Sequence, residues 1–283
     1  MSDITQEKFF DESLRIQKEI SNKIDIIEKT SRYSEWQRII HSKEYKNKIN
    51  KFGFRLYSQH DQDGILEYLL NSMHICGGIF LEFGCETGIE NNTRYLLLKN
   101  FSGKWIDSNA EYIRFIGDLY KNLIDEKRLE TECLKINSTN INNVVRDNLD
   151  VLVIDTDWND YWIFNALEKL PKIIVIEYNS FLGKEASVTV PENNEFVWTG
   201  TNYFGSSWRA LLNLGLDKGY TLVSCSIAGS DMFFVRNDLI KYLEFSKYFN
   251  SEELYESPKY NLCFNLGHPL MVEKMPIESW IYV

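Results

Sequence analysis

Two short apolar stretches constrain the fold of this chain more than any other feature of its sequence. They read "VLVI" at 151–154 and "IIVI" at 173–176, within predicted strands at 149–157 and 172–179, and polar residues follow each directly. Strands that lack a polar face are typical of the centre of a parallel sheet, where helices cover both faces. The pair therefore predicts an α/β fold with a mainly parallel sheet.

Further strands and helices alternate around this pair from about residue 78 onward. The other strands are expected at 78–84, 103–109, 130–137 and, as a closing hairpin, in "YTLVSCSI" and "DMFFVRN". Helical patterns are expected at 91–99, 110–125, 160–169 and 206–218. Residues 180–204 show no periodicity, and a loop of this length is usually functional or disordered; its many aromatic residues argue against disorder.

Composition narrows the classes of function that this chain can have. It has 41 acidic and 31 basic residues and a net charge of −10, whereas binding to nucleic acid phosphates needs a basic surface. The five cysteines are scattered without a CxxC pair, which argues against zinc sites and a disulfide framework. We find no signal-peptide core and no apolar run long enough to span a membrane. We therefore expect a cytoplasmic protein that does not bind nucleic acid and does not span a membrane.

Residues 1–50 differ from the rest of the chain and predict a helical extension. Phe9, Ile16, Ile20, Ile24 and Ile27 lie along one face of a helix, whereas Leu14 and Ile26 fall off this stripe. The stripe could pack on its own domain, or it could form a helical pair or coiled contact between two subunits. We expect a homodimer.

A glycine turn, "GCETG" at 84–88, follows the first predicted strand. In open α/β sheets the ligand binds beyond the carboxyl ends of the strands, and Gly84 and Gly88 allow a backbone to approach it closely. The turn lacks the GxGxxG fingerprint of dinucleotide sites, and Glu86 within it would repel a pyrophosphate. The turn therefore favours a ligand without phosphates.

Two further strand ends point to a nucleoside. Asp107 ends the second strand, where an acidic residue would accept hydrogen bonds from ribose hydroxyls, although it could also be a residue at the start of a helix. Asn137 follows the third strand and could reach an adenine edge or start a turn. S-adenosylmethionine, a nucleoside joined to a group without phosphates, fits these three strand ends best.

The longer motifs resemble a group of class I S-adenosylmethionine-dependent methyltransferases. "LEFGCETGIENNTRYLL", "WIDSN", "LDVLVIDTDWNDYW", "VIEYN" and "TNYFGSS" together resemble a bacterial group related to the FkbM-type enzymes, which often serve surface-sugar pathways. "YSQHDQDGILEYLL" is similar to the SQxGxDG segment of that group, with Asp61 where glycine is common. The resemblance implies a Rossmann-like sheet of seven strands with strand seven antiparallel. It covers about residues 54–240.

The resemblance also implies a division of the chain and roles for individual residues. The division is an N-terminal helical extension at 1–50, a methyltransferase domain at 51–245 and a tail packing near the active site at 246–283. The cofactor site would combine Glu82, Gly84 and Glu86 around the methionine part, Ser58 and Gln59 at its carboxylate, Asp107 at the ribose, Asn137 near the adenine, and Asp155.

Acidic residues follow the fourth and fifth strands and suggest how the chemistry works. Asp155 and Asp157 come after the fourth strand, and Glu177 and Asn179 close the fifth. Asp155, Glu177 and Asn179 offer the oxygen ligands that Mg²⁺ prefers, and a metal could lower the pKa of an acceptor hydroxyl. Alternatively, Asp155 or Asp157 acts as a general base without metal, or the cluster only orders its loop.

Other candidates concern the acceptor and a second base. Trp158, Asp160, Trp198 and Tyr203 are expected in the wall that binds the acceptor, because aromatic faces beside polar groups suit a sugar; the loop aromatics could equally form a satellite core.

His60 and His268 are the histidines that could serve as a catalytic base, with His268 in a tail turn that could fold over the crevice. Cys85 lacks a basic partner in the local sequence and is expected to be a packing residue rather than a nucleophile.

These expectations define one function and two alternatives. The sequence favours an O-methyltransferase that uses S-adenosylmethionine, with or without Mg²⁺, on a sugar or sugar nucleotide for capsular or other cell-surface polysaccharide. The alternatives are a nicotinamide-dependent oxidoreductase and a non-catalytic partner protein with the methyltransferase fold.

Overall fold

A seven-stranded sheet forms the centre of the molecule, with the strand order β3-β2-β1-β4-β5-β8-β7. The computed structural model describes residues 3–196, 198, 200–259, 262 and 279–283. The strands of this sheet are β1 (Ile79–Phe83), β2 (Ser102–Asp107), β3 (Leu129–Cys133), β4 (Val151–Ile154), β5 (Ile173–Glu177), β7 (Tyr220–Cys225) and β8 (Asp231–Arg236). The pairs from β3 through β5 are parallel, whereas β8 runs antiparallel to both β5 and β7. Because β8 is the seventh strand of this sheet along the chain, the predicted fold class is confirmed.

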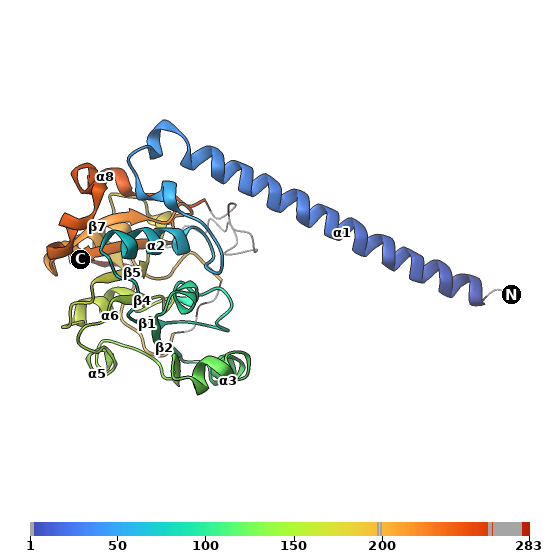
Figure 1. Cartoon of the computed structure of the whole chain (residues 1–283), viewed down its shortest axis with the longest axis horizontal. Coiled ribbons are helices and arrows are strands. Elements are labelled where there is room, and N and C mark those ends of the chain that lie inside the picture. Colours follow the sequence, from blue (N-terminus) through green and yellow to red (C-terminus); the bar gives the residue numbers. More distant parts are fainter. Residues whose placement is uncertain (1–2, 197, 199, 260–261, 263–278) are drawn as a thin grey trace.

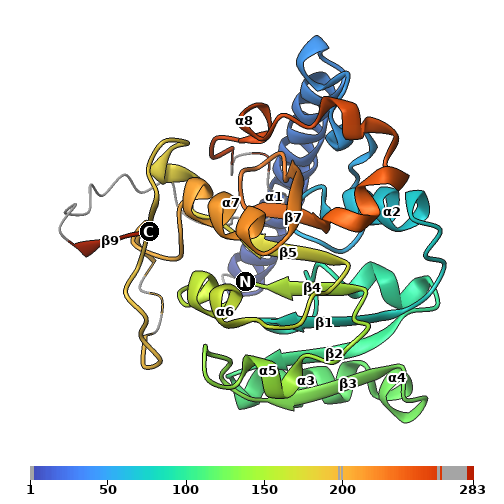
Figure 2. The same cartoon turned by 90° about the vertical axis from the view of Figure 1, so that its left-hand side faces the viewer.

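Helices cover both faces of the sheet, as the wholly apolar strands predict (Figure 2). The α-helices after the N-terminal one are α2 (Gln62–Ser72), α3 (Ala110–Leu119), α4 (Lys121–Asp125), α5 (Ile141–Val144), α6 (Asp160–Ala166), α7 (Trp208–Asp217) and α8 (Ser251–Leu254). One core layer joins the sheet to α5, α6, α7 and α8, and the other joins it to α2 and α3. Alternate residues of β4, such as Leu152 and Val153, point into opposite layers, so this strand is buried on both faces.

Short 3-10 helices fill several of the connections. They are η1 (Lys43–Tyr45), η2 (Ile49–Phe52), η3 (Arg94–Leu98), η4 (Ser180–Leu182), η5 (Asn237–Tyr242) and η6 (Glu244–Tyr248). The predicted helix at 91–99 is wrong in type, because only η3 forms there and Glu82 fixes the preceding backbone at residues 92 and 93. The predicted helix at 110–125 is broken at Tyr120 into α3 and α4.

The region 180–204 is more ordered than its lack of periodicity predicts. It contains β6 (Val188–Thr189), which pairs antiparallel with β9 (Ile281–Tyr282) close to the end of the chain. Sequence periodicity could not reveal this strand because its partner lies about ninety residues away and it is only 2 residues long.

The N-terminal helix α1 (Asp3–Ile40) is 38 residues long and projects away from the sheet and its helices (Figure 1). Among the described residues, only the last turns of α1 pack against the rest of the molecule, where Trp36 and Ile40 join a small cluster with Tyr45, Ile227 and Leu262. The alternative in which the stripe packs on its own domain therefore fails for most of α1.

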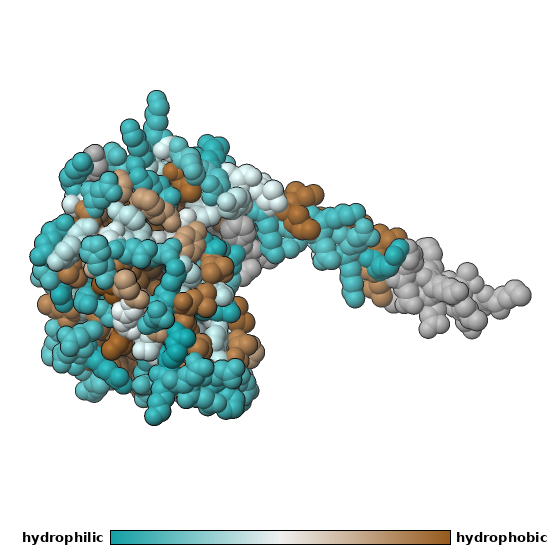
Figure 3. Space-filling view, viewed as in Figure 1, coloured by the Kyte–Doolittle hydropathy of each residue, from teal (hydrophilic) through white to brown (hydrophobic). Residues whose placement is uncertain are grey.

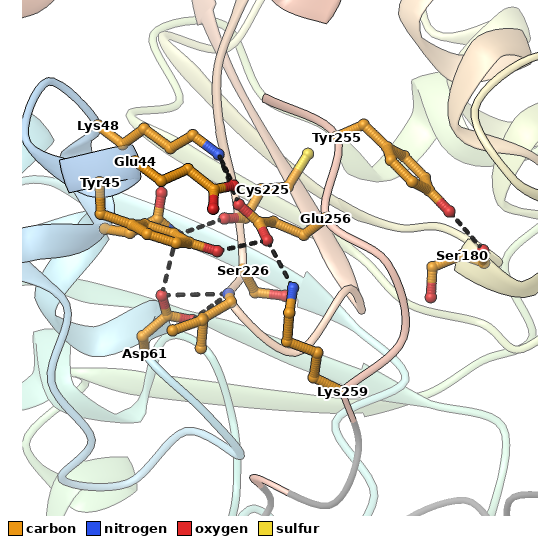
Figure 4. Close-up of polar contacts among 12 residues, drawn as sticks. Glu44, Tyr45, Lys48, Asp61, Ser180, Cys225, Ser226, Tyr255, Glu256 and Lys259 are labelled. Atoms are coloured by element: carbon orange, nitrogen blue, oxygen red, sulfur yellow. Dashed lines mark hydrogen bonds and ion pairs between the residues drawn. The ribbon is translucent and has the colours of Figure 1, made fainter. Parts of the chain in front are cut away.

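A buried ionic cluster joins the segment after α1 to the tail (Figure 4). The carboxylate of Glu256 accepts hydrogen bonds from Tyr45 Oη at 2.6 Å, Lys48 Nζ at 2.9 Å and Lys259 Nζ at 2.8 Å. We call these four residues the Glu256 cluster. Tyr178 Oη, at the end of β5, donates to the Glu256 carbonyl oxygen at 2.6 Å. The cluster thus ties the segment after α1 and residues 256–259 to the end of β5.

Among the described residues, none of the helices is both long enough and apolar enough to cross a lipid bilayer.

Candidate functional site

A cavity of about 590 Å³ opens where the parallel strands end, at the edge of the sheet that the glycine turn predicts. Its wall includes residues at the carboxyl ends of β1, β2, β4 and β5 and at the start of β8. Carboxylates dominate this wall, whereas Lys135 and His60 are its basic side chains. The acidic lining residues are Glu82, Glu86, Glu90, Asp107, Asp155, Asp157, Glu177 and Asp231. Such a cavity favours a cationic ligand.

The glycine turn needs glycine at its first position. Gly84 has a φ of +70°, and a Cβ on it would lie 1.6 Å from the carbonyl oxygen of Asp155. A side chain there would separate the ends of β1 and β4, so the close approach of these two strands depends on this residue. Glu86 has a left-handed φ of +45° and lies exposed in the cavity wall.

Asp107 connects the glycine turn to the end of β2. Its Oδ2 accepts a hydrogen bond from the Glu86 backbone amide at 2.9 Å, and its Oδ1 accepts one from the Asn109 amide at 2.7 Å. Burial raises the pKa of the Asp107 carboxyl. Because each carboxylate oxygen has two lone pairs, both can still accept hydrogen bonds from a ligand in the cavity.

Asp155, Asp157 and Glu177 form a compact group that we call the cavity carboxylates. One carboxylate oxygen of each lies within 4.8 Å of the others. Burial raises the pKa of Asp155 and Glu177 well above the usual range, and the neighbouring carboxylates raise it further. Burial of its carboxyl in the cavity wall, together with Asp107, raises the pKa of Asp157. The sequence prediction that the ends of β4 and β5 bring these residues together is confirmed.

Two features show that the cavity carboxylates form a strained, electrostatically unfavourable group. Asp157 adopts a left-handed φ of +63°, which is uncommon for a residue other than glycine. Glu177 is buried, and its Oε2 finds no hydrogen-bond partner among the described residues. A proton or a cation bound at this oxygen would remove the cost of an unpaired buried charge.

Asn179 does not share this environment, although it was expected to complete a metal site. Its Nδ2 donates to the carbonyl oxygens of Asn202 at 2.8 Å and Phe204 at 3.0 Å, and its Oδ1 accepts from the Phe181 amide at 3.2 Å. These contacts hold the loop after β5, so Asn179 has a structural role. Asp157 takes the third place among the cavity carboxylates.

Glu82 lines the cavity but uses both carboxylate oxygens to hold the next loop. Oε1 accepts from the Asn92 amide at 2.8 Å, and Oε2 accepts from the Thr93 amide at 3.1 Å and from the Thr93 hydroxyl. Thr93 in turn accepts a hydrogen bond from Trp105 Nε1 at 2.8 Å. Glu82 therefore shapes the wall around the expected methionine part by fixing this loop.

Like Asn179, four other predicted site residues lie outside the cavity lining. Ser58 is fully buried, and its Oγ accepts a hydrogen bond from the Asp63 amide at 3.2 Å. Asn137 caps a turn, because its Oδ1 accepts hydrogen bonds from the Thr139 and Asn140 amides at 2.9 and 3.2 Å. The turn alternative for Asn137 is therefore correct, and Leu134, Lys135 and Ile136 line the cavity in its place.

The other two corrections concern the acceptor wall. Asp160 is fully buried and accepts hydrogen bonds from the Thr156 amide at 2.8 Å and hydroxyl at 3.0 Å, which orders the turn after β4. Tyr203 donates its hydroxyl hydrogen bond to the Ser279 carbonyl oxygen and packs edge-on against Trp280, with ring centroids 4.8 Å apart. Both side chains therefore order loops beside the cavity and do not line it.

The remaining aromatic candidates belong both to the cavity wall and to a satellite core, the two roles that the sequence left open. Trp158 and Phe196 stack with ring centroids 3.3 Å apart and belong to a satellite core with Val188, Val190 and Trp280. Trp158, Phe196 and Trp198 also line the cavity. The satellite core therefore presents part of its aromatic surface to the cavity.

Gln59 and His60 lie in the cavity wall, as expected from the segment before α2. His268 lies outside the described residues, and its role stays a prediction. Cys85 is buried, and burial together with the nearby Glu82 raises the pKa of its thiol, so the packing interpretation is confirmed.

The sequence reasoning missed Asp231 and Gln62. Asp231 faces Glu177 in the register of β8 and β5, and its Oδ2 accepts a hydrogen bond from Gln62 Nε2 at 2.7 Å. The signal was available, because the second strand of a hairpin that runs antiparallel to β5 must begin at the edge where β5 ends. An acidic residue at that start belongs to the cavity.

Comparisons with known proteins identify no family model and no curated protein that matches this chain. Similar solved structures include the N-terminal domain of EvdMO1 with SAH bound, at 13% identity and a TM-score of 0.42, covering 72% of this chain and 94% of that chain. TrmK of M. capricolum in complex with S-adenosyl-homocysteine is 11% identical with a TM-score of 0.36, covering 60% of this chain and 67% of that chain.

TehB from Haemophilus influenzae is another similar structure, at 15% identity and a TM-score of 0.38, covering 60% of this chain and 61% of that chain. All three likenesses are low, so the fold class of this chain rests on the strand order and register of its own sheet.

Proposed function

We propose that this chain is an S-adenosylmethionine-dependent O-methyltransferase that acts on a sugar or sugar nucleotide for capsular or other cell-surface polysaccharide. The observation that carries the proposal is the strongly acidic cavity at the carboxyl ends of β1, β2, β4 and β5, beside the Gly84 turn. A cytoplasmic location belongs to the same proposal, since sugar nucleotides and S-adenosylmethionine are cytoplasmic metabolites.

The cavity wall has the chemistry that this cofactor needs. S-adenosylmethionine carries a positive sulfonium and an ammonium group, which the acidic lining favours, and lacks phosphates, which the lining would repel. Asp107 would accept hydrogen bonds from the ribose hydroxyls. Leu134 and Ile136 offer apolar surface for the adenine, and Glu86 and Gln59 would border the methionine part.

When bound, the cofactor supplies an electrophilic methyl group. The chain has to hold the acceptor hydroxyl in line with it and remove a proton from that hydroxyl. Burial and neighbouring negative charge raise the pKa of Asp155, which lets this carboxylate take up a proton closer to neutral pH. Asp155 is therefore our first candidate for the general base, with Asp157 beside it.

A divalent cation offers a second way to activate the acceptor at the same place. Three carboxylates each place one oxygen atom within 4.8 Å of the others, which fits the donor set that Mg²⁺ takes. Among the described residues, Oε2 of Glu177 has no hydrogen-bond partner and is therefore available to a cation. Asp155, Asp157 and Glu177 would hold it. The protein-base and metal routes use the same residues and differ in their response to a chelator.

The acceptor wall supports a carbohydrate substrate. Trp198 and Phe196 present aromatic surface to the cavity, and Asn159 and Asn193 add amide groups beside them. Sugars have apolar C–H faces and hydroxyl edges, so a wall that combines aromatic rings with amides suits them. Lys135 also lines the cavity, and its Nζ donates a hydrogen bond to the Phe196 carbonyl oxygen at 3.2 Å.

Calorimetric titration with S-adenosylmethionine, S-adenosylhomocysteine and NADH tests the proposal. We expect saturable binding of both sulfur nucleosides and none of NADH, because the carboxylates repel a pyrophosphate. Binding of NADH alone would support the oxidoreductase alternative and overturn the proposal. Binding of none of the three would favour the non-catalytic partner protein.

A further inference from the structure

Helix α1 leaves its apolar stripe uncovered along most of its length. The exposed fractions of Ile16, Ile20, Ile24 and Ile27 are 46%, 51%, 51% and 67%. Figure 3 shows brown, apolar surface on the projecting helix between teal, hydrophilic areas. An isolated helix in water owes little stability to its own sequence, so a helix that projects with such a stripe needs a partner along its side.

The stripe is narrow and continues beyond the isoleucines as small residues. Ser13, Ser31 and Ser34 occupy the same face, because they follow the same spacing of three and four residues. Charged residues flank the stripe, with ion pairs from Lys23 to Glu19 at 2.9 Å and from Arg32 to Glu28 at 3.6 Å. A narrow seam of branched residues between mixed charges is typical of helices that pair with each other.

The distribution of charge favours a second copy of the same chain as the partner. Residues 1–50 contain 10 of the 31 basic residues and 9 of the 41 acidic ones, so the rest of the chain has 21 basic and 32 acidic residues and a net charge of −11. Two such acidic bodies repel each other. A contact between two nearly neutral helices avoids this repulsion if it keeps the bodies apart.

We propose that α1 pairs with α1 of a second copy in an antiparallel coiled coil centred near residue 22. In this register Ile16 faces Ile27 of the second copy, Ile20 faces Ile24, and Ser13 faces Ser31. Lys23 of each copy comes beside Glu19 of the other, so the flanking charges are complementary. The bodies then lie at opposite ends of the paired helices, whereas a parallel pair would bring them together.

The length of the seam is sufficient for a reversible dimer. From Ser13 to Ser34 the helix rises by about 32 Å, at about 1.5 Å per residue, which corresponds to three heptads on each copy. This contact is smaller than the roughly 800 Å² per partner of a standard interface, so we expect the dimer to dissociate on dilution. The proposal goes beyond the proposed function and does not depend on it.

Light scattering coupled to size exclusion tests the pairing on the full chain. Wild-type protein is expected at twice the 33.3 kDa of one chain at high concentration. The double variant Ile20→Asp/Ile24→Asp is expected to be a monomer, with the midpoint of dissociation shifted at least 100-fold. Ile26→Asp is the matched control, because Ile26 is exposed to 62% but lies off the stripe. It should stay dimeric.

Two results would overturn the pairing. One is a wild-type monomer at all concentrations. The other is a double variant that dimerises as well as Ile26→Asp does. Circular dichroism of each variant shows whether the body keeps its fold. Binding of the wild type, but not of the double variant, to anionic lipid vesicles while the chain stays monomeric would identify a membrane as the partner and would also refute the proposal.

Cysteine cross-linking tests the orientation. Oxidation of a mixture of Ser13→Cys and Ser31→Cys proteins is expected to give a covalent dimer, and each variant alone should not give one. Wild-type protein is the control for the exposed Cys76 and Cys133. Cross-linking of Ser31→Cys protein with itself would show a parallel pair and overturn the antiparallel register.

Discussion

The cavity carboxylates and the Glu256 cluster both contain buried acidic side chains, but the charges around them have opposite signs. Lys48, Lys259 and Tyr45 donate hydrogen bonds to the Glu256 carboxylate (Figure 4). Around Asp155 and Glu177, by contrast, burial and other carboxylates combine to raise the pKa. A buried ion pair is costly to break, because removal of one partner leaves the other charge uncompensated, whereas a crowded group of like charges favours a proton or a cation from outside.

This difference assigns one cluster to the fold and the other to chemistry. The Glu256 cluster connects the segment after α1, the tail and, through Tyr178, the end of β5. The cavity carboxylates lie at the ends of β4 and β5, which already pair through their backbones, so their repulsion lowers stability without adding a structural link. Functional sites commonly lower stability in this way.

Asp155→Asn should produce the largest effect, and on catalysis rather than on folding. Loss of a general base or metal ligand is expected to reduce the methyl transfer rate about 10²- to 10⁴-fold. The free energy of unfolding should not fall, because the amide removes a like charge. Initial rates with a labelled methyl donor and urea denaturation measure the two quantities. Full activity of the variant would refute the role of Asp155.

Glu256→Gln should lower the free energy of unfolding by about 3 kcal/mol, because buried Lys48 loses its ion pair at 2.9 Å and keeps only the exposed Glu44 carboxylate at 3.7 Å. Urea denaturation of the variant and the wild type measures the difference. Affinity for S-adenosylhomocysteine should be unchanged in the folded variant. If affinity falls while stability holds, the two clusters are not separate in function.

Mg²⁺ should stabilise the wild type, since three carboxylate oxygens lie within 4.8 Å of one another. A ligand at 100 times its Kd adds about 2.7 kcal/mol, which raises the melting temperature by several degrees. Glu256→Gln should keep this response, and Glu177→Gln should lose it. If Mg²⁺ does not change the melting temperature and a chelator does not change the methyl transfer rate, Asp155 would act as a general base without a metal.

Glu177→Gln should give the smallest effect, and its sign should be opposite to that of Glu256→Gln. We expect the free energy of unfolding to rise by about 1 kcal/mol at neutral pH. Burial and neighbouring carboxylates raise the pKa of Glu177 in the folded protein above its ordinary value of 4.5. The folded state then binds more protons than the unfolded state from pH 4.5 upward, so this group lowers stability as pH rises. The gain of the variant should therefore grow above pH 4.5 and vanish below it.

Urea denaturation of both proteins from pH 4 to pH 8 measures this difference. A pH-independent offset between the two curves would show that the variant acts through packing and not through titration of Glu177.

The strands and most helices could be predicted because their signals are local. "VLVI" and "IIVI" correspond to β4 and β5 within the predicted bounds, and the hairpin of β7 and β8 was expected as well. The strand β6 escaped prediction because it exists only through its pairing with β9. Local periodicity cannot report a pairing between distant segments.

Candidate site residues were predicted less well than the elements that carry them. Residues directly at strand ends, such as Asp107 and Glu177, lie in the cavity as expected. Asn137 and Asp160 lie a few residues beyond the ends of β3 and β4, and Ser58 precedes α2; all three accept hydrogen bonds from backbone amides instead. Short polar side chains near turns can bind a ligand or accept hydrogen bonds from nearby backbone amides. The sequence alone does not show which amides will lie close enough to donate to them.

By itself the sequence determined the mainly parallel sheet, the edge at which its polar strand ends meet and the stripe along α1, because hydrophobic period and turn residues act over a few neighbours. Only the tertiary structure decided that Gln62 binds Asp231, that Asn179 turns to its loop and that Glu256 binds Lys48 and Lys259. These outcomes depend on which distant groups share a volume once the chain is packed. That packing sets the hydration and the partners of each charge.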